Sequence, residues 1–576
     1  MTLVTLHHVE PAINAPRKTA TTTSAFPAPT SIPLIKYGVV IDAGSSGSRI
    51  FVYRWETVAD EEPLKIVKIF PSTPADEHRA VVEGGIQTKG ASQATMDEYL
   101  TPLLLSAKEF LQSQDPPPRD VPIYLLATGG MRSLKTQDQG PILDFAHTVI
   151  SSYSSTFHIG TRATTTRVIT GELEGLYGWV ALNYGRYASE PIVGLQEMGG
   201  ASIQIAFRDV SGRIDDMTRV CLLSAPEGHS VYSATWDGFG ADTMRGNLLQ
   251  LLSNEAGLER WVIDNPCLPR GEVGKPFGNP PRWSVGTGDF AACLKITKRL
   301  LEMGSKVHEG IPSYPDIKPS TNHFLGVSNY WYTYQFFGNW GGYDLGRVYD
   351  RQRFEAAAAK YCSHTWGELD VKVDKYVEAK CFNAAWMLTL LHDHEHGFGL
   401  EMTKYETWRG LFRFPTTPVL ASRSSWTMGA IALVARHGGL KFCPDDDEEM
   451  LALSYNTSTY GQSSPLVVPH IDVGVPPSTV PSVQEVEVPS SHVIASILNP
   501  IGSAPLVVNV ALLVVLIVSM VVISYRRLYH SRPSAVPSVY NAILEEEMFD
   551  AEEQQVLFGG RPAFVRSGEV KIIPCA

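Results

Sequence analysis

Apolar residues recur along the middle of the chain with the spacings of both strands and helices. Short apolar runs of strand length lie at residues 37–41, 50–55, 123–127, 192–197 and 203–207. Longer stretches with helical spacing lie at residues 96–112 and 382–391. Strand-like runs mixed with helical stretches are typical of α/β proteins. The pattern therefore predicts an α/β fold for residues 36–443.

The segment 504–525 differs from this part of the chain because it carries no charged residue. It is long enough to cross the roughly 30 Å hydrocarbon core of a bilayer as a helix. A buried core helix is the alternative, but such a helix normally has one apolar stripe, whereas this segment is apolar all round. Arg526 and Arg527 follow it at once, while Glu485 and Glu487 precede it. The positive-inside tendency thus predicts a single C-terminal transmembrane helix with a cytoplasmic tail and a lumenal or extracellular N-terminal part.

The remaining segments have the composition of linkers and tails. Residues 1–35 are rich in Thr, Ala and Pro and are predicted to be disordered. They hold no continuous apolar run of signal-peptide type, so the sequence does not explain how the lumenal part is translocated. Residues 444–503 are interpreted as a Ser/Pro/Val-rich stalk with a solvated acidic start. The cytoplasmic tail, 526–576, carries a short motif at Tyr540 that could bind sorting machinery.

Composition excludes some classes of protein. The chain has 576 residues, of which 44% are hydrophobic, and this is enough apolar material to exclude global disorder. Its net charge of −12 argues against a nucleic-acid-binding protein, which should carry a clustered basic face. A phosphate-bearing small substrate is still compatible, because backbone N–H groups and a divalent cation can neutralise phosphate locally.

The cysteines fit an oxidising compartment. Cys267 and Cys293, and likewise Cys362 and Cys381, are close enough in sequence to close short disulfide loops, although buried free thiols are the alternative. Cys575 lies on the predicted cytoplasmic side and should stay reduced. A glycosylation sequon begins at Asn456, on the predicted lumenal side. We therefore expect a glycosylated, disulfide-containing lumenal region.

Two segments of the sequence resemble each other. Each is an apolar strand that ends in a carboxylate (Asp42 or Glu197), followed by a turn of small residues and a second apolar strand. Two ordinary hairpins would not need the acid and the small residues at the same offsets. The similarity predicts two related lobes that face each other across a cleft.

Both turns have the composition of an anion-binding loop. Successive backbone N–H groups in such a turn can hold phosphate oxygens, and glycine lets the backbone approach them closely. The first turn is not a P-loop, because no Lys follows its glycine and it leads into a strand. The small residues that we expect to hold phosphate are Ser45, Ser46 and Gly47 in the first turn and Gly199, Gly200 and Ala201 in the second.

Two further segments carry candidate chemistry. Residues 125–132 form a strand-to-loop junction with Thr128, two glycines and Arg132, which by itself is a weak signal. In residues 171–179, glycines interrupt a helix start at a propensity cost of order 1 kcal/mol each, which suggests close packing. Glu174 is the candidate general base there. Glu172 is interpreted as a solvated acid at the helix N-terminus.

These segments, in this order, resemble the successive conserved regions of the apyrase family, the nucleoside triphosphate diphosphohydrolases. Further matches begin at Ser233, Asn265, Phe324 and Ser425, and several are most similar to the Golgi-type apyrases. The resemblance covers nearly all of residues 36–443. It implies two actin-like (ribonuclease H-like) lobes around a cleft, formed by residues 36–190, completed by about 420–443, and by residues 191–419.

The resemblance also implies a role for each site residue. Asp42 and Glu197 would hold Ca²⁺ or Mg²⁺ through waters, and Glu174 would be the base. Ser202 and Gln204 would fix the attacking water, and the phosphates would contact the two turns and Thr128. Positioning and charge stabilisation are what phosphoryl transfer chiefly needs.

Two positions depart from the family pattern. The family usually has Asp where this chain has Glu197, so the extra methylene moves the carboxylate and changes how it meets a metal. Gly47 stands where many cell-surface members carry His. Their preference for triphosphates or diphosphates is therefore not carried over.

Three other features are open to a chemical interpretation. The cluster at residues 392–396 contains three histidines at alternate positions, which suit neither one helical face nor an HExxH site, so a solvated polar turn is favoured. The run Tyr330, Trp331, Tyr332 could stack on a base or pack in the core. Arg245 could contact substrate.

The leading hypothesis is a lumenal, membrane-anchored hydrolase of nucleoside tri- or diphosphates in the Golgi or another secretory compartment. An actin-like kinase is the alternative enzyme, because it also has two-lobed phosphate loops. A third possibility is a catalytically inactive nucleotide-binding membrane protein. The carboxylates at Asp42, Glu174 and Glu197 argue against it.

Overall fold

The fold is described from a computed structural model. The structure describes residues 34–57, 65–185, 191–209, 217–222, 225–306, 323–340, 345, 349–369, 377–399, 412–413 and 425–447. All of them belong to the first of two compact units, Met1–Gly474 and Val475–Ala576. The predicted membrane helix, the cytoplasmic tail and nearly all of the predicted stalk lie outside the described residues. Within those residues, no helix is both long and apolar enough to cross a membrane.

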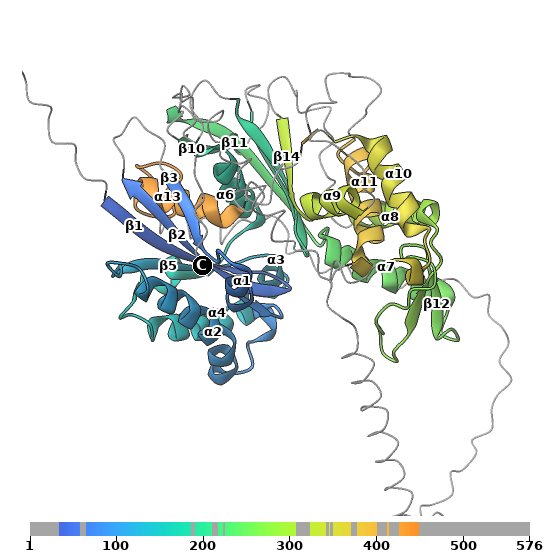
Figure 1. The fold of residues 1–576 in the computed structure, drawn as a ribbon, viewed down its shortest axis with the longest axis horizontal. Helices are drawn as coiled ribbons and strands as arrows, with labels where there is room; N and C mark the ends of the chain where they lie inside the picture. The colour runs from blue at the N-terminus through green and yellow to red at the C-terminus, as the bar shows by residue number, and fades with distance from the viewer. Residues whose placement is uncertain are drawn as a thin grey trace, which may run out of the picture. The chain divides into compact units, whose positions relative to one another are not determined.

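The first sheet is built around the strand pair that encloses the first small-residue turn (Figure 1). Its strands are β1 (Leu34–Ala43), β2 (Gly47–Thr57), β3 (Lys65–Phe70), β4 (Val81–Glu83), β5 (Val121–Ala127), β6 (Phe157–His158) and β7 (Thr166–Val168). The main order is β3-β2-β1-β5, and β7 pairs with the far side of β5. Strand β2 runs antiparallel to both neighbours, whereas β1, β5 and β7 are parallel.

The second sheet repeats this plan. Its strands are β8 (Val193–Met198), β9 (Ser202–Arg208), β10 (Thr218–Leu222), β11 (Ala225–Asp237), β14 (His323–Ser328) and β15 (Phe412–Arg413). The order is β10-β11-β9-β8-β14-β15, in which β9 is antiparallel to β8 and β11 while β14 and β15 run parallel to β8. Strands β11, β9, β8, β14 and β15 therefore match β3, β2, β1, β5 and β7 in order and direction. This confirms the α/β class and the duplicated unit that the sequence predicts.

Helices cover both sheets. The helices that follow strands of the first sheet along the chain are α1 (Pro74–Arg79), α2 (Gln93–Gln112), α3 (Gly129–Arg132), α4 (Thr136–Ser151), α5 (Arg162–Thr165) and α6 (Gly171–Asn183), with a 3₁₀ turn at Ile86–Thr88. Those of the second are α7 (Ala241–Ala256), α8 (Phe290–Ser305), α9 (Asn329–Trp340), α10 (Arg351–Cys362) and α11 (Lys380–His392), with 3₁₀ turns at Trp366–Glu368 and Val377–Ala379. The small strands β12 (Val262–Asn265) and β13 (Trp283–Gly286) form a separate ribbon, and α13 (Trp426–His437) follows β15.

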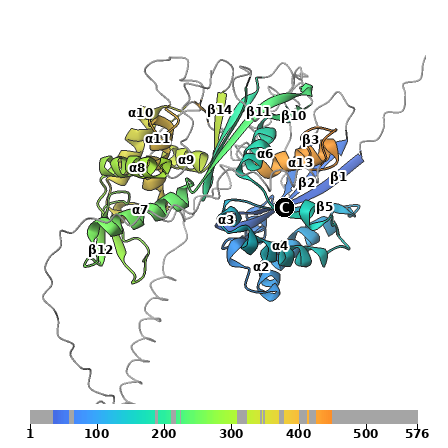
Figure 2. The same cartoon turned by 180° about the vertical axis from the view of Figure 1, so that it is seen from behind.

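From Gly38 to Ile41, strand β1 is buried on both faces, as expected for a strand with helices on each side. Val39 and Ile41 pack in a core with α2 and α4, whereas Val40 packs in a different core with α6 and α13. Helix α13 lies against β1 and β2, and α6 lies against β8, β9 and β11. The two helices pack on each other, so the two sheets are joined through a double layer of helix, visible from both sides in Figures 1 and 2.

The contact between α6 and α13 requires a residue without a side chain. A Cβ atom on Gly429 of α13 would overlap the carbonyl of Tyr177 on α6. Nearby, the Tyr53 hydroxyl of β2 and the Thr427 hydroxyl of α13 lie 2.7 Å apart in a buried hydrogen bond. Helix α13 is therefore bound to the first sheet through Thr427 and packs closely on α6 through Gly429.

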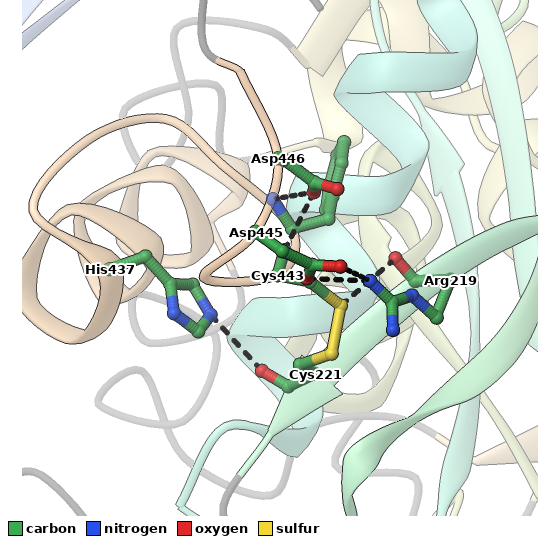
Figure 3. Close-up of a disulfide and its surroundings, with 7 residues drawn as sticks. Arg219, Cys221, His437, Cys443, Asp445 and Asp446 are labelled. Carbon is green, nitrogen blue, oxygen red and sulfur yellow. Dashed lines mark hydrogen bonds and ion pairs between the residues drawn. A yellow bond between two sulfur atoms is a disulfide. The ribbon is translucent and has the colours of Figure 1, made fainter.

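Three disulfides stabilise the described part of the chain. Cys267–Cys293 and Cys362–Cys381 confirm the two predicted pairs. The third, Cys221–Cys443, joins β10 to the segment after α13 and spans 222 positions in sequence. Around it, the Cys221 amide donates to the Phe442 carbonyl at 2.9 Å. Arg219 contacts Asp445 at 2.6 Å (Figure 3). The disulfide thus attaches the segment that follows α13 to an edge strand of the second sheet.

The start of the predicted stalk contributes to the same junction. Asp446 accepts hydrogen bonds from the amides of Phe442 at 3.1 Å and Cys443 at 2.7 Å. Asp445 is exposed but paired with Arg219. These two acids therefore belong to the folded region.

Substitution of Gly429 by Ala should destabilise the protein, because the new methyl group must push α6 and α13 apart. Overpacking of this kind costs about 1–3 kcal/mol, and differential scanning calorimetry should show a lower unfolding temperature. Gly246→Ala is the matched control, since a methyl group added to Gly246 in α7 would meet no atom within 4 Å. That control should be neutral or stabilising by about 0.5–1 kcal/mol. Equal effects of both substitutions would contradict the proposed close contact.

Replacing Cys221 and Cys443 together by Ser should also lower the unfolding temperature. A disulfide that closes a long loop restricts the unfolded chain, and its loss costs about 2–5 kcal/mol. Cys575→Ser, which lies outside the described residues and in the predicted cytoplasmic tail, serves as the control and should leave the unfolding temperature unchanged. An unchanged unfolding temperature in the double variant would show that the pair is not closed in the purified protein.

Candidate functional site

The two small-residue turns have the same geometry. The Gly44 amide donates to the Gly47 carbonyl at 3.0 Å, and the Gly199 amide donates to the Ser202 carbonyl at 2.9 Å. Across each hairpin the acid occupies the same register position, since Asp42 pairs with Arg49 and Glu197 pairs with Gln204. The equal offsets seen in the sequence therefore correspond to equal positions in the two sheets.

The turns lie next to each other. A Cβ atom built on Gly200 would be 3.3 Å from the Ser45 hydroxyl oxygen, and one on Gly130 would be 2.7 Å from the Ser45 Cα. A Cβ atom on Gly129 would be 3.0 Å from the Cβ of Ala201. The turn after β5 thus lies between the two predicted phosphate loops, and the three turns form one composite site.

Hydrogen bonds to the carbonyl groups hold the loops in place. The amides of Ala241 and Asp242, at the start of α7, donate to Gly199 at 3.0 Å and to Gly200 at 2.9 Å. Gln87 donates its side-chain amide to the Ser45 carbonyl at 2.9 Å, and the Gly84 amide donates to the Ser46 carbonyl at 3.0 Å. Within the described part of the chain, the backbone amides of four loop residues donate to no protein group: Ser45, Ser46, Gly200 and Ala201. Backbone amides that donate to no protein group can bind an anion.

Glu174 reaches this site from the first turn of α6. Thr170 caps that helix, accepting from the Leu173 amide at 3.2 Å. A Cβ atom on Gly171 would overlap the Thr235 side chain, and one on Gly175 would overlap the Ser233 hydroxyl. The two glycines let α6 lie directly on β11, which explains the close packing that their position in the sequence suggests. As a result, Glu174 is buried beside the ends of β9 and β11.

Polar side chains of β9 and β11 form a small patch against Glu174. Ser202 and Gln204 alternate with core residues along β9, and they pair with Asp237 and Thr235 of β11. Gln204 donates its amide to the Ser202 hydroxyl at 2.7 Å and lies 3.4 Å from the Glu174 carboxylate. The side-chain oxygen of Gln204 is buried and has no hydrogen-bond partner among the described residues, so it can accept a hydrogen bond from water.

Arg132 joins the components of the patch. Its Nη1 donates to the Glu174 carboxylate at 3.0 Å, and its Nη2 donates to the Ser202 hydroxyl at 3.0 Å. Its Nε and Nη2 contact Asp237 at 3.0 and 2.9 Å. The sequence singled out Arg132 only as part of a weak motif, and it missed Asp237. The alternation of Ser233, Thr235 and Asp237 along β11 was the available signal.

Three carboxyl groups of the site have raised pKa values, and burial is the largest cause for each. Burial raises the pKa of Asp42 to about 6, with the charge of Arg49 opposing the rise. Burial raises the pKa of Glu174 to about 7, which Arg132 opposes and Asp42 supports. Burial and then the charge of Glu174 raise the pKa of Glu197 to about 8. Burial of this kind favours either protonation or a bound cation.

A cation held through water fits these residues. Glu197 accepts from the Ser328 hydroxyl at 2.7 Å through Oε1, whereas its Oε2 is buried without a protein partner among the described residues. Carboxylate oxygens are the ligands that Ca²⁺ and Mg²⁺ prefer, and Mg²⁺ usually keeps several waters. Over the residues with described positions, no group of three or more His, Cys, Asp or Glu side chains could hold a metal directly. The arrangement therefore suits coordination through waters, not a direct protein cage.

The other sequence candidates lie at the ends of a strand and of a helix. Thr128 is buried at the end of β5, where its amide donates to the Ala43 carbonyl at 3.2 Å. His392 lies 2.8 Å from the Tyr349 hydroxyl, and Asp393 caps the following turn by accepting from the His396 amide at 2.9 Å. The turn at the helix end is therefore polar as predicted, but it is only partly solvated, because His392 and Asp393 are buried while His394 and Glu395 are exposed.

The aromatic run after β14 separates into two environments. Tyr330 and Trp331 are buried in the core, whereas Tyr332 is 55% exposed. Core packing therefore accounts for the first two, and Tyr332 is the member that a ligand could contact. Arg245 pairs with Asp242 at 3.5 Å and with Glu378 at 3.6 Å, one turn beyond the start of α7.

The chain is similar to known proteins over most of its length. A "Golgi apyrase" of Schizosaccharomyces pombe is 30% identical over 461 residues, covering 71% of this chain and 77% of the relative. A "Nucleoside-triphosphatase ntp-1" of Caenorhabditis elegans is 30% identical over 429 residues, covering 69% and 73%. A solved nucleoside triphosphate hydrolase from Neospora caninum is 17% identical, covers 70% of this chain and 93% of that chain, and has a TM-score of 0.49.

A family model covers most of the same region. The GDA1/CD39 (nucleoside phosphatase) family model matches residues 33–441, which include both sheets and every element of the composite site. The order of motifs in the sequence had indicated the apyrases, and the repeated sheets with their paired turns supply the corresponding geometry. The chain belongs to the GDA1/CD39 (nucleoside phosphatase) family.

Proposed function

We propose that this chain hydrolyses nucleoside tri- and diphosphates to a monophosphate and inorganic phosphate, with Glu174 as the general base. The observation that carries the proposal is the hydrogen-bonded group of Glu174, Gln204 and Ser202. It lies beside two loops in which four backbone amides donate to no described protein group. Family membership supports the reaction class, as do relatives named as apyrase, nucleoside-triphosphatase and nucleoside-diphosphatase.

The proposed reaction is an in-line displacement at the terminal phosphorus. Ser202 and the side-chain oxygen of Gln204 orient a water, and Glu174 accepts its proton as the new P–O bond forms. The bond from phosphorus to the bridging oxygen breaks, and the leaving nucleotide keeps that electron pair. Amides of both loops stabilise the charge on the transferred group, which is the main requirement of this chemistry.

A divalent cation completes the proposed site. Asp42 and Glu197, with the orphaned Oε2, would hold Ca²⁺ or Mg²⁺ through waters. When bound, the cation supplies positive charge to the phosphate oxygens and to the leaving group. It would also relieve the repulsion that Asp42 exerts on Glu174 and Glu197.

The proposed setting is the lumen of the Golgi or of another secretory compartment. Two relatives, from Schizosaccharomyces pombe and Saccharomyces cerevisiae, carry the name Golgi apyrase at 30% and 28% identity. Three disulfides and the Asn456 sequon suit an oxidising lumen. The apolar segment 504–525 would anchor the chain, with the tail available to sorting machinery. We further propose that the two sheets are the actin-like lobes expected of the family.

Phosphate release separates this proposal from the alternatives. Purified full-length protein should release inorganic phosphate from one or more of ATP, ADP, GDP and UDP in the presence of Ca²⁺. An actin-like kinase would instead need an acceptor for the phosphoryl group, and an inactive nucleotide-binding protein would release none. Absence of phosphate from all four nucleotides with either cation would reject the proposal.

Glu174→Gln should lower turnover by about 10²–10⁴-fold, the usual contribution of a general base. The amide preserves the shape of the side chain but cannot accept the water proton, so nucleotide binding measured by calorimetry should change little. Glu172→Gln is the control, because Glu172 lies in the same helical turn and is half-buried away from the cluster. Near-normal turnover in the Glu174 variant would show that another group is the base.

Glu197→Gln should weaken cation binding, since it removes the charge while keeping the length of the side chain. We expect the concentration of Mg²⁺ or Ca²⁺ for half-maximal activity to rise about tenfold or more, a size typical of perturbed metal sites. The cation alone should also raise the unfolding temperature of the wild type more than that of the variant, a readout that needs no turnover. Identical cation responses in both assays would place the cation elsewhere.

A further inference from the structure

Asp237 binds the guanidinium group of Arg132 with both carboxylate oxygens. The Nε of Arg132 lies 3.0 and 3.1 Å from the two oxygens, and Nη2 lies 2.9 Å from the nearer one. This fork geometry is the strong form of an Arg–carboxylate pair. The Arg132 side chain is 9% exposed and that of Asp237 is 29% exposed, so the pair is only partly screened by solvent.

The strand register fixes Asp237 in this position. On β11 it is the direct partner of Ser202 on β9, and its neighbour Trp236 points into the core on the opposite face. Arg132 comes from α3, after β5 of the first sheet. The ion pair therefore links a residue of the first sheet region to the end of a strand in the second, directly beside the Ser202 hydroxyl.

Arg132 divides its charge between two carboxylates. Burial alone would lower the pKa of Arg132, but the charge of Asp237, and after it that of Glu174, holds this pKa above its usual value. Asp237 is thus the stronger partner. Because a single positive charge next to Glu174 would make that carboxylate a weaker base, the negative charge of Asp237 limits how far Arg132 suppresses its basicity.

We propose that Asp237 is a positioning residue for hydrolysis, a proposal that rests on the proposed role of Glu174 as the base. Asp237 anchors the guanidinium group of Arg132 so that Nη1 contacts Glu174 and Nη2 contacts Ser202. Its negative charge also offsets the positive charge of Arg132 next to Glu174. Asp237 itself touches neither Glu174 nor the Gln204 amide in a described hydrogen bond. It acts through the guanidinium group.

The charged groups that face Glu174 come from four elements. They are Arg132 on α3, Asp42 on β1, Glu197 on β8 and Asp237 on β11. A cation bound through Asp42 and Glu197, and the ionisation of the nucleotide, affect the wild type and an Asp237 variant alike. The difference between their pH profiles therefore isolates the contribution of Asp237.

The test is the pH dependence of kcat/KM for the full-length wild type and for Asp237→Asn, at a fixed saturating cation concentration. Glu174 acts as a base only when ionised, so activity rises with pH through its pKa. Without the negative charge of Asp237, the positive charge of Arg132 acts more strongly on Glu174 and lowers the pKa of Glu174. We expect the acid limb to move down by about 0.5–1 pH unit, within the range produced by a nearby charge. The plateau kcat should fall, because the base is weaker, while KM changes little.

Matched variants exclude a merely structural effect. Asp237→Glu keeps the charge and should restore the wild-type midpoint, at least in part, whereas Asp237→Ser should reproduce the shift. Asp264→Asn, an exposed acid on β12, changes the net charge equally and should leave the profile unchanged. A uniform loss of activity at all pH values, or an unshifted limb in both charge-removing variants, would overturn the proposal.

The Glu174→Gln variant distinguishes this failure from failure of the proposed function. If its residual activity kept the wild-type acid limb, Glu174 would not be the base, and the inference about Asp237 would fall with that assignment. If Glu174→Gln abolished the acid limb of the pH profile while Asp237→Asn left its midpoint unchanged, Glu174 would remain the base. Only the inference about Asp237 would then be wrong.

Discussion

The close approach of α6 to its neighbours is the constraint on which the rest of the structure depends. This helix lies between β11 on one side and α13 on the other, and glycines on α6 and on α13 make these two contacts possible. Gly171 and Gly175 face β11, and Gly429 of α13 faces the carbonyl of Tyr177. Glycine is unfavourable within a helix by roughly 1 kcal/mol relative to Ala. Its presence here is explained by packing, because it sets the separation between the two sheets.

The same constraint creates the chemistry of the site. Since α6 begins directly against β11, Glu174 is buried where β9 and β11 place Gln204, Ser202 and Asp237. Burial then raises the proton affinity of the carboxylate, and Arg132 keeps it from becoming too high. A base in this environment is poised near neutral pH, which suits proton abstraction from water. The packing of α6 and the raised pKa of the proposed base, Glu174, are therefore two results of one close contact.

Much of this arrangement could be predicted from the sequence. The period of apolar residues located the main strands, and the equal offsets of Asp42 and Glu197 predicted the repeated hairpin. Two disulfides were predictable because their cysteines are close in sequence. Cys221–Cys443 was not, because its partners are brought together only by the packing of α13 near β10. The roles of Arg132 and Asp237 were also hidden, since they depend on strand register and on which face of β11 meets α6.

The two hairpins of the site have the same backbone arrangement, but their carboxylates have different surroundings. The extra methylene of Glu197 contributes to this difference. Asp42 is opposed by Arg49, whose charge limits the rise in its pKa. Glu197 is paired across its hairpin with Gln204, where Asp42 is paired with Arg49. Its carboxylate accepts a hydrogen bond from Ser328 instead. The backbone of Ser328 is in the left-handed region, at φ 56°. Non-glycine residues in that region are uncommon and cluster at functional sites. The longer side chain brings the carboxylate to a hydroxyl on the neighbouring strand while leaving Oε2 without a partner among the described residues. Burial raises the pKa of both groups, to about 6 for Asp42 and to about 8 for Glu197. In the proposed site, a bound cation would therefore oppose the larger rise at the end of the second sheet.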